Sequence, residues 1–397
     1  MSRQKKNFKN GLIKVILAIG IIIGFILIMF TSNIGPWLQT PNLKGPYLSW
    51  TEDPKTTMTI SWETPIPTNG TVQWGENISY GNIKASTPSI GNLRSVTLTG
   101  LEPNKTYHYR IISNIKNYSQ LLIDHQFKTA PNSTIPFTFL VYGDSRPDIF
   151  GNSAHGRICK EMLKTEPNPA FVLHTGDIVF QSNLEYQWDR FFWEAKDIMA
   201  RAPFFTTLGN HEYNEYSGDN GKHYFNFFNY PNNEWYYSFN YSNVHIICLN
   251  LSVSNVHISS AQKAWLINDL NKANSSSNIN WIIIFFHVPL YSSGEYGDDP
   301  YEIQDLQPIF TQYKVDLVFS GHDHQYERIF VDGVQYVVAG GGGSENEVYI
   351  GSEAGTQYSE NIHQFCSVEV NNLTLTVKAY TSLGILFDQF TLNSNHP

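Results

Sequence analysis

The order of apolar and polar residues divides the chain into two regions with different rhythms. From Lys44 to Ala130, short runs alternate apolar with polar residues and are separated by turn residues, as in MTISW, TVQW, SVTL and YHYRII. A period of two predicts strands with one buried face, and many short strands at close spacing are typical of a sandwich. We therefore predict a small all-β sandwich over residues 44–130.

From Ile135 onward, the pattern changes to short continuous apolar runs that are followed by helix-like segments. Continuous runs such as FTFLVY and WIIIFF indicate strands that are buried on both faces. The tail from Gln335 returns to strands, so residues 135–397 are predicted to form an α/β domain of two packed sheets with helices outside. Four helices are expected, over residues 154–164, 185–200, 260–271 and, after Pro300, 303–313.

The N-terminal segment is a separate unit. Basic residues up to Lys14 precede the apolar stretch Val15–Phe30, and no acidic residue occurs before Glu52. Residues 1–34 therefore resemble a retained membrane anchor or a cleaved secretory signal, while a soluble core helix would show amphipathic spacing that is absent here. Since no small-x-small cleavage site follows Phe30, we favour a single-span anchor with the catalytic domain outside the cell; cleavage would give a secreted protein. Residues 35–43 are predicted to be a spacer.

Charge and cysteine content exclude some classes of function. The formal net charge is −9, with 26 basic and 35 acidic residues. A chain of this charge lacks the basic surface of a nucleic-acid scaffold, so we predict no such role. The three cysteines, Cys159, Cys248 and Cys366, do not make a disulfide framework.

Five polar blocks each follow an apolar run in the second region, and they carry the chemistry. Ligands bind where the strands of an open α/β sheet end, so all five blocks can meet along one sheet edge. Together they supply two carboxylates, one amide oxygen, three imidazoles and one spare histidine. That inventory matches two adjacent metal ions that share a bridging carboxylate. The residues are Asp144, Asp177, Asn210, His287, His322 and His324, with His211 as the spare histidine.

These blocks, read in order as GDSR, GDIVF, GNHE, FFHVP and GHDHQYER, resemble the calcineurin-like metallophosphoesterases, and most closely the purple acid phosphatase branch. The resemblance covers nearly everything after Lys44. The sandwich in front is similar to a fibronectin type III domain, because Leu98–Arg110 resembles its tyrosine corner, with Leu101 and Pro103 under Tyr107.

The resemblance implies a role for each block. Asp144 and His324 would bind the first metal, and Asp177 would bridge both ions. The second metal would take its remaining ligands from Asn210, His287 and His322. The implied reaction is hydrolysis of a small-molecule phosphate monoester by in-line attack of a metal-bound hydroxide, with His211 as the general acid. A phosphodiesterase or nucleotidase on the same site is an alternative, and a surface binding module with an inactive metallo-domain is another.

Two departures from the purple branch change the expectation. Phe180 stands where that branch has a tyrosine three residues after the bridging aspartate, so a colourless site of two divalent ions is predicted. Iron, manganese and zinc all suit this nitrogen and oxygen ligand set. The paired histidine that plant members carry after His287 is missing. Tyr296, in the loop that replaces it, is only a candidate for substrate contact.

Two further residues have two interpretations each, and a third has one. Arg146 can fork onto a phosphate oxygen or pair with an acid such as Asp148. Glu212 can orient His211 or lie on the surface. His174 is expected to support the ligands without binding a metal itself.

Overall fold

The structure is a computed structural model. The predicted anchor and spacer lie outside the residues that it describes, apart from Gly20 and Leu43. No helix within the described part of the chain is long and apolar enough to cross a membrane. The described residues are 20, 43–88, 91–113, 122–148, 151–213, 219–253, 257–346, 351–352 and 354–396.

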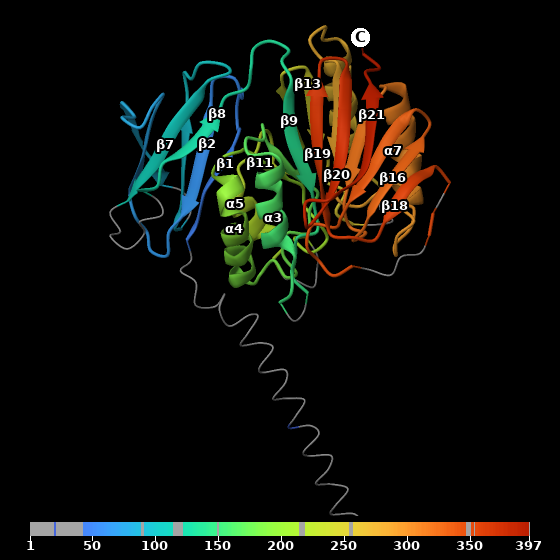
Figure 1. Ribbon diagram of the computed structural model, residues 1–397, viewed down its shortest axis with the longest axis horizontal. Helices are drawn as coiled ribbons and strands as arrows, with labels where there is room; N and C mark the ends of the chain where they lie inside the picture. Colours follow the sequence, from blue (N-terminus) through green and yellow to red (C-terminus); the bar gives the residue numbers. More distant parts are fainter. Residues whose placement is uncertain are drawn as a thin grey trace, which may run out of the picture.

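The N-terminal region is a sandwich of two four-stranded antiparallel sheets, as the period of two predicts (Figure 1). Alternate side chains such as Trp62 and Tyr109 point into it and are fully buried. The first sheet has the order β1 (Lys44–Ser49), β2 (Met58–Glu63), β6 (Leu93–Leu98), β5 (Thr87–Pro88). The second has the order β4 (Asn82–Ala85), β3 (Gly70–Gly75), β7 (Thr106–Ser113), β8 (His125–Lys128).

A tyrosine at the start of β7 closes one corner of this sandwich. The hydroxyl of Tyr107 accepts a hydrogen bond of 2.9 Å from the backbone N–H of Glu102. Its ring stacks on Phe127 with centroids 5.6 Å apart, and Leu101 beside it is buried. The corner therefore ties the loop before β7 to the strand itself.

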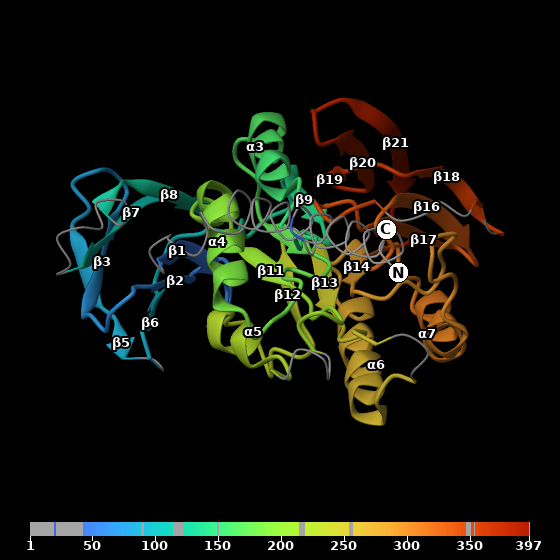
Figure 2. The same ribbon diagram turned by 90° about the horizontal axis from the view of Figure 1, so that it is seen from below.

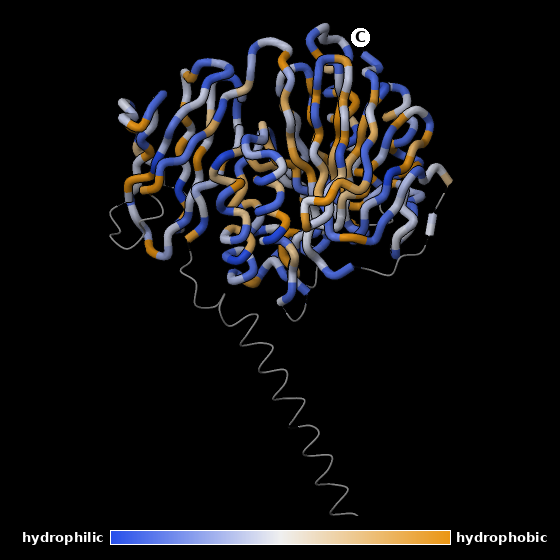
Figure 3. Tube along the Cα trace, in the orientation of Figure 1, coloured by the Kyte–Doolittle hydropathy of each residue, from blue (hydrophilic) through white to orange (hydrophobic). Residues whose placement is uncertain are grey.

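The second region consists of two larger sheets, which confirms the predicted fold class. Apolar residues follow the strands of both sheets (Figure 3). One sheet has the order β11 (Phe204–Thr206), β10 (Val172–His174), β9 (Phe137–Tyr142), β19 (Gln364–Asn371), β20 (Thr374–Thr381), β21 (Leu386–Asn393). The other has the order β12 (Tyr237–Tyr241), β13 (Val244–Cys248), β14 (Trp281–Phe285), β15 (Leu317–Ser320), β17 (Val334–Ala339), β16 (Tyr326–Val331), β18 (Thr356–Glu360).

Strand β14 shows why its sequence is apolar throughout. Ile283 and Phe285 belong to the core between the two sheets. Ile282 and Ile284 point the other way, into a second core under helices α6 (Ser260–Asn274) and α7 (Pro300–Gln312). A parallel strand covered on both faces has no position for a polar side chain, so the run ends only where the polar block begins.

Helices flank the two sheets, and four of them were predicted (Figure 2). Helices α3 (His155–Thr165) and α4 (Glu185–Met199) lie beside the six-stranded sheet that contains β9. The short helix α5 (Lys222–Phe227) was not predicted. The start of α7 was placed too late: Pro300 lies in its first turn, where proline is well tolerated, and Asp299 caps it by accepting N–H bonds from Tyr301 and Glu302.

The sandwich packs firmly on the second region. The buried amine of Lys44, on β1, contacts Glu185 and lies 2.9 Å from Asp189, both on α4. Trp50, just after β1, is fully buried and has the rings of Phe171 and Phe205 at 6.2 and 5.6 Å. These contacts hold β1 against the layer that carries the first polar blocks.

Candidate metal centre

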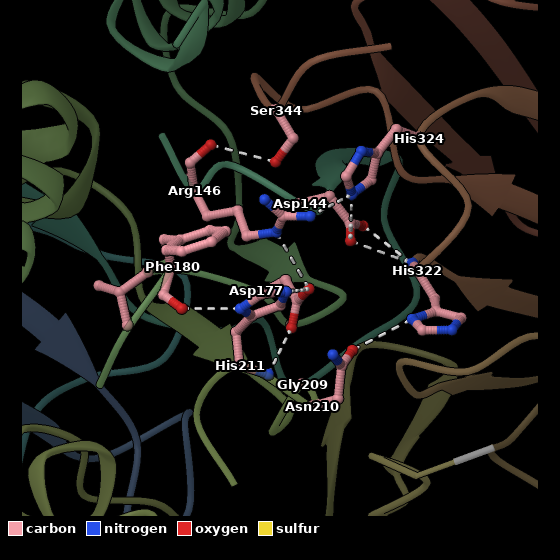
Figure 4. A network of polar contacts seen from close by, with 12 residues as sticks. Asp144, Arg146, Asp177, Phe180, Gly209, Asn210, His211, His322, His324 and Ser344 are labelled. Carbon is pink, nitrogen blue, oxygen red and sulfur yellow. Dashed lines mark hydrogen bonds and ion pairs between the residues drawn. The ribbon is translucent and has the colours of Figure 1, made fainter. Parts of the chain in front are cut away.

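The five polar blocks lie at the carboxyl ends of five strands. Asp144, Asp177 and Asn210 follow β9, β10 and β11 of the six-stranded sheet, whereas His287 and His322 follow β14 and β15 of the seven-stranded sheet. The expectation that all blocks share one sheet edge is therefore wrong. They come from two packed sheets, and the site lies where the strand ends of both sheets meet (Figure 4).

The backbone turns sharply at the ligands themselves. Asp144, Asp177 and His322 have φ angles of 58°, 54° and 71°, in the left-handed region that side chains other than glycine rarely adopt. Such strain is found at sites whose surroundings fix it. The glycine before a ligand allows close approach: a Cβ on Gly209 would lie 2.0 Å from Asp177 Oδ1, and one on Gly321 would lie 2.3 Å from Asp144 Oδ2.

One half of the site contains the two carboxylates. Ligand atoms of Asp144, Asp177 and His324 all lie within 4.8 Å of one another, and all three residues are buried. His324 Nε2 lies 3.7 Å from Asp144 Oδ1. The backbone N–H of His322 donates to both oxygens of Asp144, each at 3.1 Å, which fixes that carboxylate in place.

The other half consists of neutral ligands in contact. Asn210 Oδ1 lies 2.9 Å from His287 Nε2 and 3.1 Å from His322 Nδ1, and the two imidazole nitrogens are 3.2 Å apart. His287 Nε2 also lies 3.3 Å from Asp177 Oδ1. Asp177 thus stands between the two halves, in the position of a bridge.

The hydrogen bonds of two histidines show that these groups suit metal ions. Nδ1 of His287 lies 2.8 Å from the carbonyl of Thr175, and Nδ1 of His324 lies 2.7 Å from that of Glu345. A carbonyl only accepts, so each Nδ1 carries the proton and each Nε2 presents a lone pair. Those lone pairs face the oxygens of Asn210 and Asp144. Acceptors that converge in this way fit a cation between them.

Burial keeps the imidazoles neutral, as metal ligation requires. Burial, together with the nearby His287, lowers the pKa of His322 to about 3, and burial beside Arg146 lowers the pKa of His324 to about 3. Burial also lowers the pKa of His287. Burial opposes the charge of Asp177, yet the positive charge around it, including the guanidinium of Arg146, outweighs burial and lowers the pKa of Asp177.

His211 borders the site while its ring is oriented by a backbone group. Its Nδ1 lies 2.7 Å from the carbonyl of Phe180, and its Nε2 lies 3.7 Å from Asp177 Oδ2 (Figure 4). Nδ1 is therefore the donor, and Nε2 faces the site. The side chain is 18% exposed, so this nitrogen can meet solvent or a ligand.

Arg146 reaches into the first half of the site. Its Nε lies 3.5 Å from Asp177 Oδ2, and its Nη2 lies 3.5 Å from His324 Nε2. The guanidinium carbon lies 5.3 Å from the ring centre of Phe180. The residue is 8% exposed, and its Nε and Nη1 make no hydrogen bond to the described residues. Asp177 is thus the acid beside it, while the carboxylate of Asp148 accepts from Asn152.

Glu212 has neither of the roles expected for it. It is fully buried, and its carboxylate accepts backbone N–H bonds from Asp177 and Gly209 at 2.9 Å each and from Ile178 and Val179 at 2.9 and 3.1 Å. Burial and the charge of Asp177 raise the pKa of Glu212 to about 8, against these donors. The side chain holds the turn that contains Asp177 onto the turn that contains Asn210; it does not orient the His211 ring.

His174 and Tyr296 lie next to the candidate metal ligands. His174 is buried, and its Nε2 lies 3.0 Å from the hydroxyl of Ser145, which follows Asp144. Its Nδ1 accepts from the N–H of Gly176 at 3.2 Å. Burial holds the pKa of His174 well below its usual range. The ring of Tyr296 lies 4.2 Å from that of His322 and is 54% exposed.

Several groups that orient the site are backbone carbonyls, which sequence reasoning missed. Those of Thr175, Phe180 and Glu345 fix the tautomers of three histidines. Any residue supplies such a group, so no side-chain signal exists in the sequence. The role of Glu212 had a signal, because four N–H groups in two tight Gly-Asp and Gly-Asn turns need a buried acceptor.

Comparison with known proteins agrees with both regions of the chain. Residues 137–326 match the family described as calcineurin-like phosphoesterase, and residues 43–129 match the family described as purple acid phosphatase, N-terminal domain. The chain is 29% identical over 321 residues to mouse acid phosphatase type 7, an alignment that covers 72% of this chain and 70% of that protein. It is 28% identical over 277 residues to a probable purple acid phosphatase 20 of Arabidopsis thaliana, which covers 64% of this chain.

The plant relatives are matched over only part of their length: the alignment spans 61% of the Arabidopsis protein just named. Among solved structures, the fold is similar to that of purple acid phosphatase PPD1 from yellow lupin seeds, with a TM-score of 0.77 and 20% identity over 89% of this chain and 74% of that one. The resemblance read from the five polar blocks is thereby confirmed.

Proposed function

Because the chain belongs to the calcineurin-like phosphoesterases and carries the purple acid phosphatase N-terminal domain, we propose that it hydrolyses phosphate monoesters at a centre of two divalent metal ions. The observation that carries the proposal is the convergence of six oxygen and nitrogen ligands from five strand ends. The Nε2 lone pairs of His287 and His324 face the oxygens of Asn210 and Asp144 at 2.9 and 3.7 Å, an arrangement that a cation between them makes favourable.

The two ions would be held by different residues. Asp144 and His324 would bind the first, Asn210, His287 and His322 the second, and Asp177 would contact both. When bound, such ions neutralise phosphate charge and supply a nucleophile near neutral pH. Iron, manganese and zinc all fit these donors. The neutral amide of Asn210 adds no charge to the second ion and so preserves its strength as a Lewis acid.

His211 is proposed to donate the proton that the leaving group needs. Its Nδ1 is engaged by the carbonyl of Phe180, at 2.7 Å, so the proton is transferred from Nε2. That nitrogen lies 3.7 Å from Asp177, beside the place where the phosphorus would be attacked. A positioned acid that protonates an alkoxide as the P–O bond breaks contributes about 10²–10⁴-fold to the rate.

Arg146 is proposed to bind an oxygen of the phosphoryl group. Two of its buried nitrogens, Nε and Nη1, make no hydrogen bond within the described residues. Contact with the ring of Phe180 keeps the guanidinium at the site, and Asp177 balances its charge. Planar paired donors are suited to a phosphate. Tyr296, whose half-exposed ring covers His322, is proposed to contact the ester group of the substrate.

The location of the enzyme is a separate proposal that rests on the N-terminal sequence. We propose that residues 1–34 anchor the chain in the cytoplasmic membrane and that the catalytic domain faces outward. Recovery of the full-length protein in the membrane fraction, with its catalytic domain open to protease added to intact cells, is expected. Recovery in the culture medium with a shortened N-terminus would show cleavage instead.

Hydrolysis of two chromogenic substrates tests the proposed reaction. The purified protein, loaded with manganese, zinc or iron, is expected to hydrolyse p-nitrophenyl phosphate faster than bis(p-nitrophenyl) phosphate. Faster hydrolysis of the diester would support a phosphodiesterase or nucleotidase. No turnover of either compound with any of the three metals would support a binding module and overturn the proposal.

A further inference from the structure

A cysteine, a histidine and a glutamate form a chain of contacts outside the metal centre. Cys159 Sγ lies 3.2 Å from His155 Nε2, and His155 Nδ1 lies 3.0 Å from Glu194 Oε2. His155 and Cys159 lie one turn apart on α3, and Glu194 comes from α4. This order of groups is the one that activates a thiol: the histidine takes its proton, and the acid orients and stabilises the imidazolium.

The histidine is held rigidly in this arrangement. Its ring is stacked on that of Phe191, at 5.0 Å and 3° between the planes, and Tyr142 stacks at 5.7 Å. Glu194 is fixed in turn by the guanidinium of Arg190, whose Nε is 2.9 Å away. Burial opposes a charge on His155, but Cys159 and Glu194 outweigh it and raise its pKa to about 9.

A cleft leads to this cysteine. It has a volume of about 280 Å³, lies between α3 and α4, and is lined by Cys159 and Glu194 together with Leu163 and Trp193. Lys160, Lys196 and Asp197 are the other charged groups on its wall. Cys159 is itself only 3% exposed, but Cys248 and Cys366 are fully buried and do not line this cleft, and burial raises the pKa of Cys248 to about 12.

We propose that Cys159 is a covalent-modification site, at which the thiol, with His155 beside it to take its proton, reacts with small, soft electrophiles that enter the cleft. Low-molecular-weight disulfides are the natural class. Sγ transfers its proton to His155 Nε2 and attacks one sulfur of the disulfide; a new S–S bond forms, the old one breaks, and the departing thiolate takes up the proton. The proposal does not depend on the phosphatase activity.

A tyrosine also borders the reacting pair. Burial keeps the pKa of Tyr142 well above its usual range, so its hydroxyl, 3.0 Å from His155 Nε2, stays protonated. This hydroxyl can donate to Nε2 of the neutral imidazole, and it can accept from that nitrogen once His155 has taken the thiol proton.

Alkylation of the native full-length protein by iodoacetamide, followed by peptide mass spectrometry, compares all three cysteines in one sample. Cys159 is expected to react at least about tenfold faster than Cys248 and Cys366 and to form a mixed disulfide with cystamine. In Glu194→Gln, the alkylation rate of Cys159 should fall by about tenfold because His155 loses the carboxylate that orients it, and in His155→Gln by more. Glu161→Gln, on the same helix but paired with Lys164 at the surface, should change nothing.

If His155→Gln fails to fold, the alkylation rate of Cys159 in Glu194→Gln tests the proposal. A Cys159 rate within about threefold of the other two cysteines, or one that Glu194→Gln leaves unchanged, would show an ordinary buried thiol and overturn the proposal.

Discussion

The two halves of the metal centre are built from different kinds of ligand. The half around Asp144 and His324 contains the Asp144 carboxylate, which the other half does not share. It also contains the cation of Arg146, whose Nη2 lies 3.5 Å from His324 Nε2. The half around Asn210 contains only neutral side chains, which are in contact at 2.9 to 3.2 Å. Asp177 is the one anion that both share. The charged side chains are thus concentrated on the first half, and under the proposed function an ion bound in the second half would keep more of its strength as a Lewis acid.

Removing the shared anion should have the largest effect. Asp177→Asn is expected to reduce phosphomonoester turnover by at least about 10³-fold, because neither ion keeps its bridging ligand. Asparagine tolerates the left-handed backbone at this position, so the fold should survive. Turnover and bound metal are measured together.

The same substitution elsewhere provides the control for Asp177→Asn. Asp332 also has a left-handed backbone, with φ of 48°, but it is exposed and in a turn between two strands. Asp332→Asn should leave both turnover and metal content unchanged. Full activity of Asp177→Asn with two ions still bound would contradict its bridging role.

Replacing the proposed acid should have the next largest effect. His211→Gln is expected to lower kcat by about 10²–10³-fold with an alkyl phosphate, whose leaving group needs a proton, but much less with p-nitrophenyl phosphate. His257→Gln, at a histidine whose side chain is 54% exposed and contacts Asp305 of α7, is the matched control. Equal losses with both substrates would indicate that His211 acts otherwise than as an acid.

A smaller effect on turnover is expected when the positive charge of Arg146 is removed. Arg146→Gln should raise KM by about tenfold and weaken inhibition by inorganic phosphate to a similar degree, because a charged pair of donors is lost. Its kcat should change less. If metal binding fails while KM stays constant, the guanidinium serves to balance Asp177 and does not bind substrate.

The smallest change in rate, together with a visible change in colour, is expected when Phe180 is replaced by tyrosine. Phe180→Tyr places a phenol beside the first half, where the purple branch has its tyrosine. The iron-loaded variant should gain a visible absorption band, while turnover should stay within about tenfold of the original. A strong visible band in the unaltered iron-loaded protein would mean that another phenolate is bound, contrary to the account.

Much of this molecule could be predicted because its ligands interrupt strongly apolar strands. The run WIIIFF had to be buried on both faces, so His287 had to lie where the strand leaves the core. That argument places each ligand at a strand end, but it does not say which sheet the strand joins. The expectation that all five blocks share one sheet edge was wrong for this reason. Strands β9 and β14 are both apolar and yet lie in different sheets.

The missed details depend on long-range contacts. Glu212 was expected either to orient His211 or to lie on the surface, but the folded chain brings its carboxylate to the N–H groups of Asp177, Ile178 and Val179. The contact of Arg146 with Phe180 likewise joins segments that follow two different strands. The positions of these residues in the sequence do not reveal it. Helix α5, at six residues, is too short for a periodic signal.

Anomalous X-ray scattering from crystals of the metal-loaded protein tests the central claim most directly. Data collected at the absorption edge of the loaded metal should show two peaks roughly 3.5–4 Å apart. One should be bound by Asp144 and His324, the other by Asn210, His287 and His322, with Asp177 between them. A single peak, or two peaks that these residues do not surround, would contradict the account.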